Sequence, residues 1–267
     1  MRAVLTIAGS DSGAGAGIQA DLKTFAALGV YGTSAITAVT AQNTQGVTDV
    51  SMLSADIVTA QIEAVAGDIQ LHATKTGMLG TVAIVEAVGA AIEQLDLPLV
   101  VVDPVMVAKS GHVLVDTDGI RAMRTELLPR ALVVTPNIPE AEMLAGTTIH
   151  SLADARQAAR TIHAAGRCAV VVKGGHAPGD ELVDLLFDGH GFVEFPMRRI
   201  ATRNTHGTGC TFASAIAAHL ALGRSLTDAV GSAQAYVAGA IRHGLAIGKG
   251  HGPLDHFWEL RRPGPAL

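Results

Sequence analysis

The chain has 267 residues and a net charge of −5 at pH 7; 49% of its residues are hydrophobic and 16% are charged. This composition supplies a sizeable core and excludes wholesale disorder. The acidic balance, an aromatic content of only 3% and the lack of a basic cluster larger than residues 197–199 argue against nucleic-acid binding.

Local sequence argues against three further classes. Residues 24–48 carry no charge, but Thr, Ser, Gln and Asn interrupt them, so we expect no membrane span. The apolar run before Gly9 is too short for a secretory signal, and we therefore expect a cytoplasmic protein. The two cysteines, Cys168 and Cys210, form no Cys-x-x-Cys motif, and no His-Glu-x-x-His occurs, which argues against a zinc site.

Apolar runs typical of strands alternate along the chain with segments of helical spacing. In chain order, the pattern predicts a strand at 3–8, a helix at 17–28, an extended segment at 31–39, helices at 55–69 and 82–95, strands at 99–102, 132–135 and 169–172, a hairpin of 182–187 with 192–195, and helices at 208–222 and 226–243. This alternation, with continuously apolar strands, predicts a largely parallel sheet covered on both faces. Without a repeat or a long linker, we expect a single domain over residues 1–267.

Polar residues and glycines gather where these strands end. They form the segments Gly9–Ser10–Asp11, Asp103–Pro104, Pro136–Asn137 and Lys173–Gly174–Gly175. Ligands bind at the carboxyl edge of open α/β sheets. The pattern therefore predicts a site at that edge.

The turn at 204–210 leads directly into the last-but-one helix. Gly207 and Gly209 permit a tight turn, and the free N–H groups of the helix start attract phosphate oxygens. The same field stabilises the thiolate of Cys210, so we expect a lowered thiol pKa and a role as a base in phosphoryl transfer. The alternative is that Cys210 is a small buried core residue.

The glycine-rich segment 9–17 follows the first strand and allows several interpretations. Gly13 and Gly15 fit the start of a dinucleotide fingerprint, but Ile18 occupies the third glycine position, so the indication of NAD is weak. A flexible turn and a loop closing over a ligand are the other interpretations. No Walker A sequence occurs, which excludes a P-loop kinase.

Three charged residues at strand and helix ends are candidates for a nucleotide and its metal. Asp103 and Glu140 can each handle Mg²⁺, or can simply cap a turn and a helix. Lys173 can balance phosphate charge, or can be a solvated lysine at a strand end. Gln42 offers an amide that suits a polar heteroaromatic ring. Met78 can flank a flat substrate, or can be ordinary core.

Taken together, these segments resemble the hydroxymethylpyrimidine/phosphomethylpyrimidine kinases of the ribokinase-like superfamily. The matching segments are AGSDSGAGAGIQADLKTF, TAVTAQNTQGV, KTGMLG, VVDPVMVAKSG, TPNIPEAE, VVKGGH and NTHGTGCTFASAIAA. They occur in the expected order and cover most of the chain. The resemblance implies a three-layer α/β/α sandwich around a mainly parallel sheet, a homodimer, and Mg²⁺ with ATP as phosphate donor.

The resemblance also implies roles for individual residues. The pyrimidine would be held by Gln42, Met78, the backbone of Val105 and the Gly9–Asp11 region. Gly207, Gly209 and Cys210 would form the anion hole, with Cys210 as the base. Lys173 and Thr208 would contact ATP, and Asp103 and Glu140 would lie near Mg²⁺.

The runner-up to this resemblance is a pyridoxal-type kinase, which shares the fold and phosphorylates a similar hydroxymethyl ring. Sugar kinases of the superfamily commonly carry Asp at the position of Cys210, which argues against a sugar substrate. The segments 109–112 and 176–180 are candidates for closing over the substrate.

Overall fold

The computed structural model describes residues 1–106, 117–176 and 179–261. Eight strands form its central sheet: β1 (Ala3–Ala8), β2 (Tyr31–Ile36), β5 (Leu71–Thr76), β6 (Val100–Val102), β7 (Val133–Val134), β8 (Ala169–Val172), β9 (Glu181–Phe187) and β10 (Phe192–Arg198). Their order is β10-β9-β8-β7-β6-β5-β1-β2. All neighbours from β2 to β8 are parallel, whereas β9 is antiparallel to both β8 and β10.

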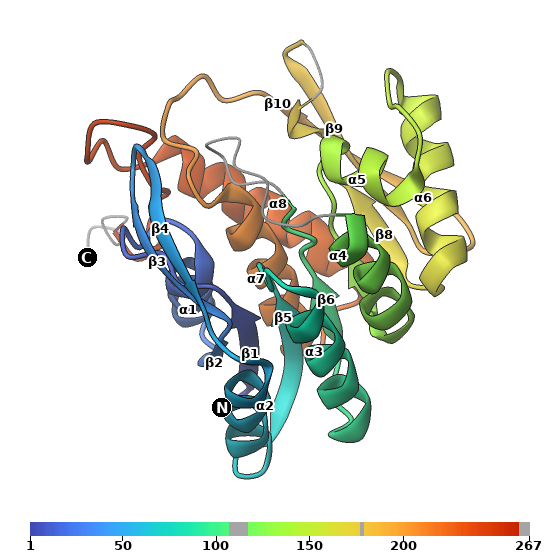
Figure 1. Cartoon of the computed structure of the whole chain (residues 1–267). Coiled ribbons are helices and arrows are strands. Elements are labelled where there is room, and N and C mark those ends of the chain that lie inside the picture. Colours follow the sequence, from blue (N-terminus) through green and yellow to red (C-terminus); the bar gives the residue numbers. More distant parts are fainter. Residues whose placement is uncertain (107–116, 177–178, 262–267) are drawn as a thin grey trace.

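Helices cover both faces of this sheet (Figure 1). One face carries α2 (Ala55–Ala66), α3 (Val82–Gln94), α4 (Thr117–Ala122), α5 (Ile138–Ala145) and α6 (Leu152–Gly166). The other face carries α1 (Gly17–Ala27), α7 (Thr208–Ala221) and α8 (Leu226–Arg242). Short helical turns are η1 (Met123–Leu127), η2 (Leu128–Arg130) and η3 (Gly174–His176). The predicted α/β/α sandwich is confirmed.

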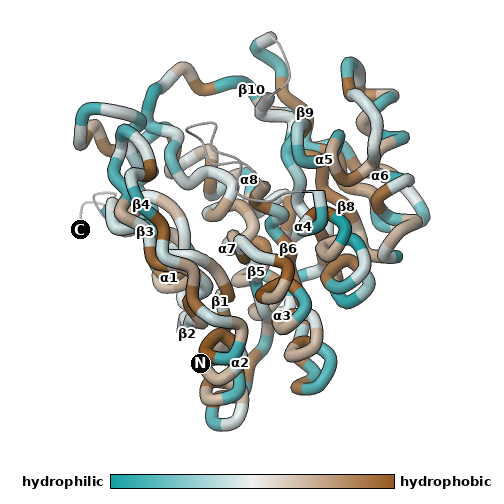
Figure 2. Tube along the Cα trace, in the orientation of Figure 1, coloured by the Kyte–Doolittle hydropathy of each residue, from teal (hydrophilic) through white to brown (hydrophobic). Residues whose placement is uncertain are grey.

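The two helical layers follow from the alternation of side chains along each strand. In β6, Val101 packs into the core beneath α7, while Val100 and Val102 pack into the core on the other face. Consecutive strand residues point to opposite faces, so a strand covered on both sides must be apolar throughout. Figure 2 shows this as hydrophobic segments along the central strands and hydrophilic ones toward the periphery.

Side-chain caps fix the start of several helices. Ser54, Thr81, Asn137, Ser151 and Ser225 each accept a hydrogen bond from a backbone N–H of the helix that they precede. Helices α1 and α7 begin differently, because neither N-cap, Ala16 or Gly207, makes a side-chain cap. Their first N–H groups are therefore not occupied by a capping side chain.

The chain departs from the predicted pattern between β2 and β5. The expected extended segment 31–39 is two strands in different sheets, because β3 (Ala38–Asn43) pairs only with β4 (Gly46–Met52). Thr37 makes the break: its N–H donates to Ala8 O (3.1 Å) and its hydroxyl to Met78 O (2.7 Å). Figure 1 shows the resulting hairpin standing beside the carboxyl edge of the sheet.

Two further expectations concern loops and membranes. The candidate closing segment 109–112 lies outside the described residues, as do residues 177 and 178 of the second candidate segment. Among the helices that the structure describes, none combines the length and apolar character needed to cross a bilayer.

Two buried histidines predict how stability changes in acid. Burial lowers the pKa of His219 and of His256 to about 4, with the nearby cations Arg224 and Lys23 acting in the same direction. Unfolded histidine binds its proton near pH 6.5, so between about pH 6.5 and pH 4 the unfolded state binds more protons. Stability should fall across this window by about 1.4 kcal/mol per pH unit for each histidine.

Urea unfolding of wild type and His256→Gln at pH 7 and pH 4.5 measures this contribution. The variant loses the contact between His256 Nε2 and Thr211 Oγ1 (3.1 Å) at either pH, but it should lose less stability on acidification. His190→Gln, in the exposed turn after β9, is the control and should behave as wild type. Equal acid sensitivity of wild type and His256→Gln would contradict the prediction.

Candidate active site

A cavity of about 830 Å³ opens at the carboxyl edge of the parallel strands. The loops after β1, β5, β6, β7 and β8, the β3–β4 hairpin and the start of α7 supply its walls. Every residue predicted for the site lines it: Gly9, Asp11, Gln42, Met78, Asp103, Val105, Glu140, Lys173, Gly207, Thr208, Gly209 and Cys210. Their roles stay predictions; their convergence is a property of the fold.

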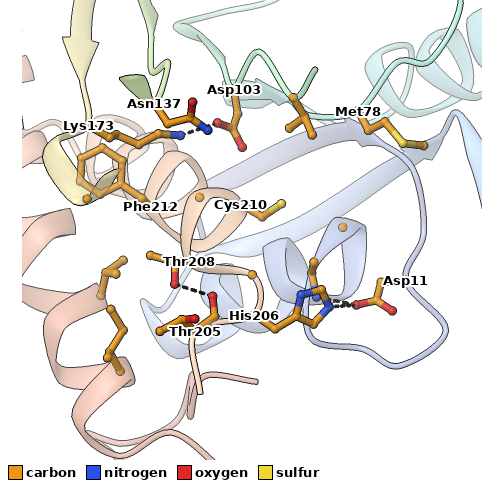
Figure 3. A pocket seen from close by; sticks show the side chains of 18 of the residues that line it. Asp11, Met78, Asp103, Asn137, Lys173, Thr205, His206, Thr208, Cys210 and Phe212 are labelled. Atoms are coloured by element: carbon orange, nitrogen blue, oxygen red, sulfur yellow. Dashed lines mark hydrogen bonds and ion pairs between the residues drawn. The ribbon is translucent and has the colours of Figure 1, made fainter. Parts of the chain in front are cut away.

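The start of α7 forms one wall of the cavity. Gly207 has φ +85°, and a Cβ there would lie 1.8 Å from Gly15 O, so only glycine fits. The Thr208 hydroxyl donates to Thr205 O (2.8 Å), which turns the chain into the helix. The N–H groups without a side-chain cap and the positive helix end suit this wall to binding an anion (Figure 3).

The glycine loop opposite is organised around the Asp11 carboxylate. Backbone N–H groups of Gly13, Gly15 and Ala16 donate to it at 2.8–3.0 Å. His206 Nε2 lies 2.9 Å from Asp11 Oδ2, and since a carboxylate only accepts, this nitrogen carries the proton. Burial acts to raise the pKa of Asp11, but these hydrogen bonds outweigh it and hold that pKa below its usual value.

Asp11 therefore has a structural task that its predicted role in substrate binding did not include. Its oxygens hold the loop together and tie it to the residue before Gly207. His206 was missed as a site residue, although it stands inside the motif that carries Cys210. Its only sequence signal was a polar ring beside two glycines.

Asp103, Lys173 and Glu140 form a charged cluster at the ends of β6, β8 and the start of α5. Lys173 Nζ donates to Asp103 Oδ1 at 3.0 Å, and the two side chains are only 15% and 2% exposed. Burial raises the pKa of Glu140 to about 7, opposed by Lys173 and reinforced by Asp103. Glu140 also accepts a hydrogen bond from the Asn137 N–H (2.8 Å). It therefore both caps the start of α5 and lines the cavity.

The described residues contain no group of three or more acidic, histidine or cysteine side chains able to enclose a metal ion. Two carboxylates at one cavity wall are nevertheless the protein share that Mg²⁺ commonly takes when phosphates and water complete its shell. Asp103 and Glu140 thus fit an Mg²⁺ ion that arrives with a nucleotide.

Met78 and Gln42 line another part of the cavity. Met78 lies against the loop after β1 so closely that a Cβ on Gly9 would be 2.5 Å from Met78 Cε. Gln42, from the β3–β4 hairpin, accepts from the Thr40 hydroxyl (3.3 Å) and lies 3.4 Å from His206 Nε2. An amide and a thioether lining one cavity suit a planar ring with polar edges.

Cys210 stands on the anion wall, but the prediction of a lowered thiol pKa is wrong for the protein without nucleotide. Burial raises the pKa of Cys210 to about 11; Lys75 lowers it, Asp21 and Asp103 raise it, and the backbone N–H of Gly17 lowers it. Proximity to helix starts is therefore not enough to lower the thiol pKa, because burial destabilises the thiolate more than the helix dipoles stabilise it.

A buried ion pair beneath the cavity was not predicted. Lys75 Nζ lies 2.9 and 3.1 Å from the two carboxylate oxygens of Asp21, and both side chains are 0% exposed. The sequence did hold a signal, because Asp21 falls on the helical face of Ile18 and Phe25, where a charge is costly without a partner. Lys75 sits in a strand too polar to be recognised as one.

Residues 11–255 match the family described as Phosphomethylpyrimidine kinase. The chain belongs to this family. The hydroxymethylpyrimidine/phosphomethylpyrimidine kinase of Rhizobium meliloti is 52% identical over 95% of this chain and 96% of that protein.

Two further similar proteins carry names that state different functions. The thiamine biosynthesis bifunctional protein ThiED of Geobacter sulfurreducens is 49% identical over 95% of this chain, which spans only 52% of that longer protein. The pyridoxal kinase of Staphylococcus aureus, solved with AMP-PCP and pyridoxal, has a TM-score of 0.90 and 41% identity, covering 98% of this chain and 96% of that one. The match thus confirms the predicted family and leaves two ring chemistries to separate.

Gly207→Ala tests the close approach on which the anion wall depends. A methyl group at this position meets Gly15 O, whereas Gly223, with the similar φ of +87°, has nothing within 4 Å. Gly223→Ala should cost about 1 kcal/mol from backbone strain alone, and Gly207→Ala at least about 2 kcal/mol more. Urea unfolding measures the difference, and equal costs would show that the contact is not needed.

Proposed function

We propose that the protein transfers the γ-phosphoryl group of ATP to the hydroxymethyl oxygen of 4-amino-5-hydroxymethyl-2-methylpyrimidine, and then a second phosphoryl group to the monophosphate so formed. The observation that carries the proposal is the start of α7, which has no side-chain cap, beside Lys173 in one cavity. A Cβ placed on Gly209 would lie 3.4 Å from Lys173 Nζ, so the ammonium is next to the helix start. Phosphate oxygens bound there would meet both backbone N–H donors and the ammonium.

The nucleotide end of the cavity is then the charged one. Lys173 and the Thr208 backbone would hold ATP phosphates, and Gly207, Gly209 and Cys210 would receive the group in transfer. Asp103 and Glu140 would hold Mg²⁺, which when bound neutralises charge on the phosphates. Lys173 is paired with Asp103 at 3.0 Å, so this carboxylate also orients the lysine.

The phosphate acceptor would bind in the part of the cavity lined by Gln42 and Met78. Gln42 would bind the polar edge of the pyrimidine, Met78 would cover its face, and the backbone near Gly9 and Val105 would complete the contact. The acceptor oxygen would form a bond to phosphorus while the bond from phosphorus to the ADP oxygen breaks. For the first step, Cys210 as thiolate would take the hydroxyl proton; for the second, the acceptor is already a phosphate oxygen.

A pyridoxal kinase is the second candidate because the Staphylococcus aureus structure of that name matches nearly the whole chain. A pyrimidine substrate is preferred because the names of the matching family and of the Rhizobium meliloti relative both refer to a pyrimidine. A homodimer and a cytoplasmic location are further proposals; exposed Tyr31 and Val39, on the consecutive strands β2 and β3, supply apolar surface for a second copy.

ADP release with Mg·ATP tests the function directly. Hydroxymethylpyrimidine, its monophosphate and pyridoxine are compared side by side under identical conditions. We expect turnover of both pyrimidines, with kcat/KM for pyridoxine lower by at least about tenfold, which is the discrimination that one or two ring contacts supply. Preference for pyridoxine would move the protein to vitamin B6 chemistry, and no turnover of any of the three would refute the proposal.

Cys210→Ala tests the base. We expect kcat for hydroxymethylpyrimidine to fall about 100-fold, with little change in KM. Because the thiol pKa is raised to about 11, the thiolate fraction grows with pH, so wild-type kcat should rise between about pH 7 and pH 9 and the variant should lack that rise.

The chain offers a matched control in its other cysteine. Cys168 is buried in the core on the far side of the sheet from α7, so Cys168→Ala should change stability and leave the pH profile intact. A Cys210→Ala enzyme with wild-type kcat would remove the residue from the base role.

A further inference from the structure

The Lys75–Asp21 pair is the most deeply buried charge in the described part of the chain and lies beside the proposed reaction centre. Lys75 is on β5 and Asp21 on α1, and neither has exposed side-chain surface. Lys75 nevertheless lines the same cavity as Cys210. A Cβ on Gly77 would lie 2.7 Å from Lys75 Nζ, so the glycine leaves room for the ammonium where β5 ends.

Asp21 is fully occupied in holding the lysine. Besides Lys75, it accepts from the hydroxyls of Thr6 (2.7 Å) and Ser214 (2.6 Å). These donors come from β1 and α7, so one carboxylate joins three elements below the cavity floor. Within the described residues, the hydrogen bonds recorded for Lys75 all go to Asp21, although an ammonium has three protons to donate.

Stability alone does not explain such a pair. Replacing a buried ion pair by apolar residues is often neutral or stabilising, because the desolvation of two charges costs so much. We therefore looked for a functional role of the buried charge near the cavity. The candidate task lies at Cys210, whose position on the first turn of α7 is one helical turn before Ser214.

We infer that Lys75 is a positioning residue for the proposed reaction: its buried ammonium, fixed by Asp21, acts on Cys210 to favour the negatively charged form of the sulfur. The inference rests on the proposed role of Cys210 and deepens it. The cation supplies, from below, a positive charge that stabilises the negative charge formed on the sulfur.

The charged groups around Cys210 make the sign of the effect definite. Lys75 lowers the pKa of the Cys210 thiol, whereas Asp21 and Asp103 raise it, and among these charges Lys75 acts most strongly. Lys173 also interacts with Cys210 from the cavity wall. Removal of Lys75 leaves the anionic neighbours unbalanced, so the thiolate should become harder to form.

The test measures the thiol without any substrate. The rate of carbamidomethylation of Cys210 by iodoacetamide, in which the thiolate displaces iodide, is followed by mass spectrometry from about pH 7 to pH 11, in the full chain. Only the thiolate reacts, so the rate reports its fraction. We expect Lys75→Met to react about tenfold more slowly than wild type at each pH below the wild-type midpoint, which corresponds to a pKa higher by about one unit.

Ser214→Ala is the matched control. It removes one hydrogen bond to Asp21 from α7 itself and changes no charge, so it should lose stability and keep the wild-type reaction profile. If Lys75→Met fails to fold, Asp21→Asn/Lys75→Met removes both charges together; because Lys75 acts more strongly on the thiol than Asp21, this variant should still react more slowly than wild type.

Two outcomes overturn the inference. One is a folded Lys75 variant with an unchanged alkylation profile; the other is a Ser214→Ala profile displaced as far as that of Lys75→Met, which would make the pair purely structural. A slower Lys75 variant, in a protein that releases no ADP with any ring alcohol, would support the effect on the thiol while refuting the proposed function.

Discussion

The approach of Gly207 to the backbone of Gly15 is the constraint on which the cavity depends. Two chain segments almost 200 residues apart touch without side chains between them, and the Asp11–His206 hydrogen bond closes the contact. This brings the start of α7, which has no side-chain cap, next to the start of α1, where the Ile18 N–H donates to Gly9 O (3.0 Å). The positive ends of two helix dipoles then act on one small volume.

The charges around that volume are arranged in layers. Lys173 and Asp103 lie at the wall, partly accessible to a ligand, while Lys75 and Asp21 lie beneath with no exposure. Wall charges can exchange a protein partner for a phosphate or a metal ion. The lower pair has no such exchange open to it, and its field is constant whatever the cavity holds. The site thus combines one adjustable pair with one fixed pair.

The sequence predicted the layers and most elements because apolar runs such as β1 and β8 carry the period of a covered strand. It missed β5, because His72, Thr74, Lys75 and Thr76 interrupt the apolar run, and Lys75 is there as one member of the buried ion pair. The β3–β4 hairpin was not predicted, and residues 31–39 were predicted as one extended segment, because Thr37 redirects the chain through two long-range hydrogen bonds. Neither feature has a local period.

The sequence predicted which residues line the cavity better than it predicted the protonation chemistry of Cys210. Strand-end position located Asp103 and Lys173, and the family motifs located Gln42 and Met78. The thiol pKa of Cys210 could not be predicted in the same way, because it depends on burial and on four charges, of both signs, that folding brings together. A motif reports that a helix start lies next to the sulfur; it does not report how much water has been removed.

That balance gives a physical reason for a cysteine at position 210. Asp21, Asp103 and Glu140 already place carboxyl groups around the cavity that would receive phosphates. A further carboxylate on the first turn of α7 would occupy the anion site with permanent negative charge. A thiol held neutral by burial leaves the site open to phosphate, and it becomes charged only when it loses its proton. Beneath it, Lys75 lowers the cost of that state without competing for the ligand, since its hydrogen bonds are directed to Asp21.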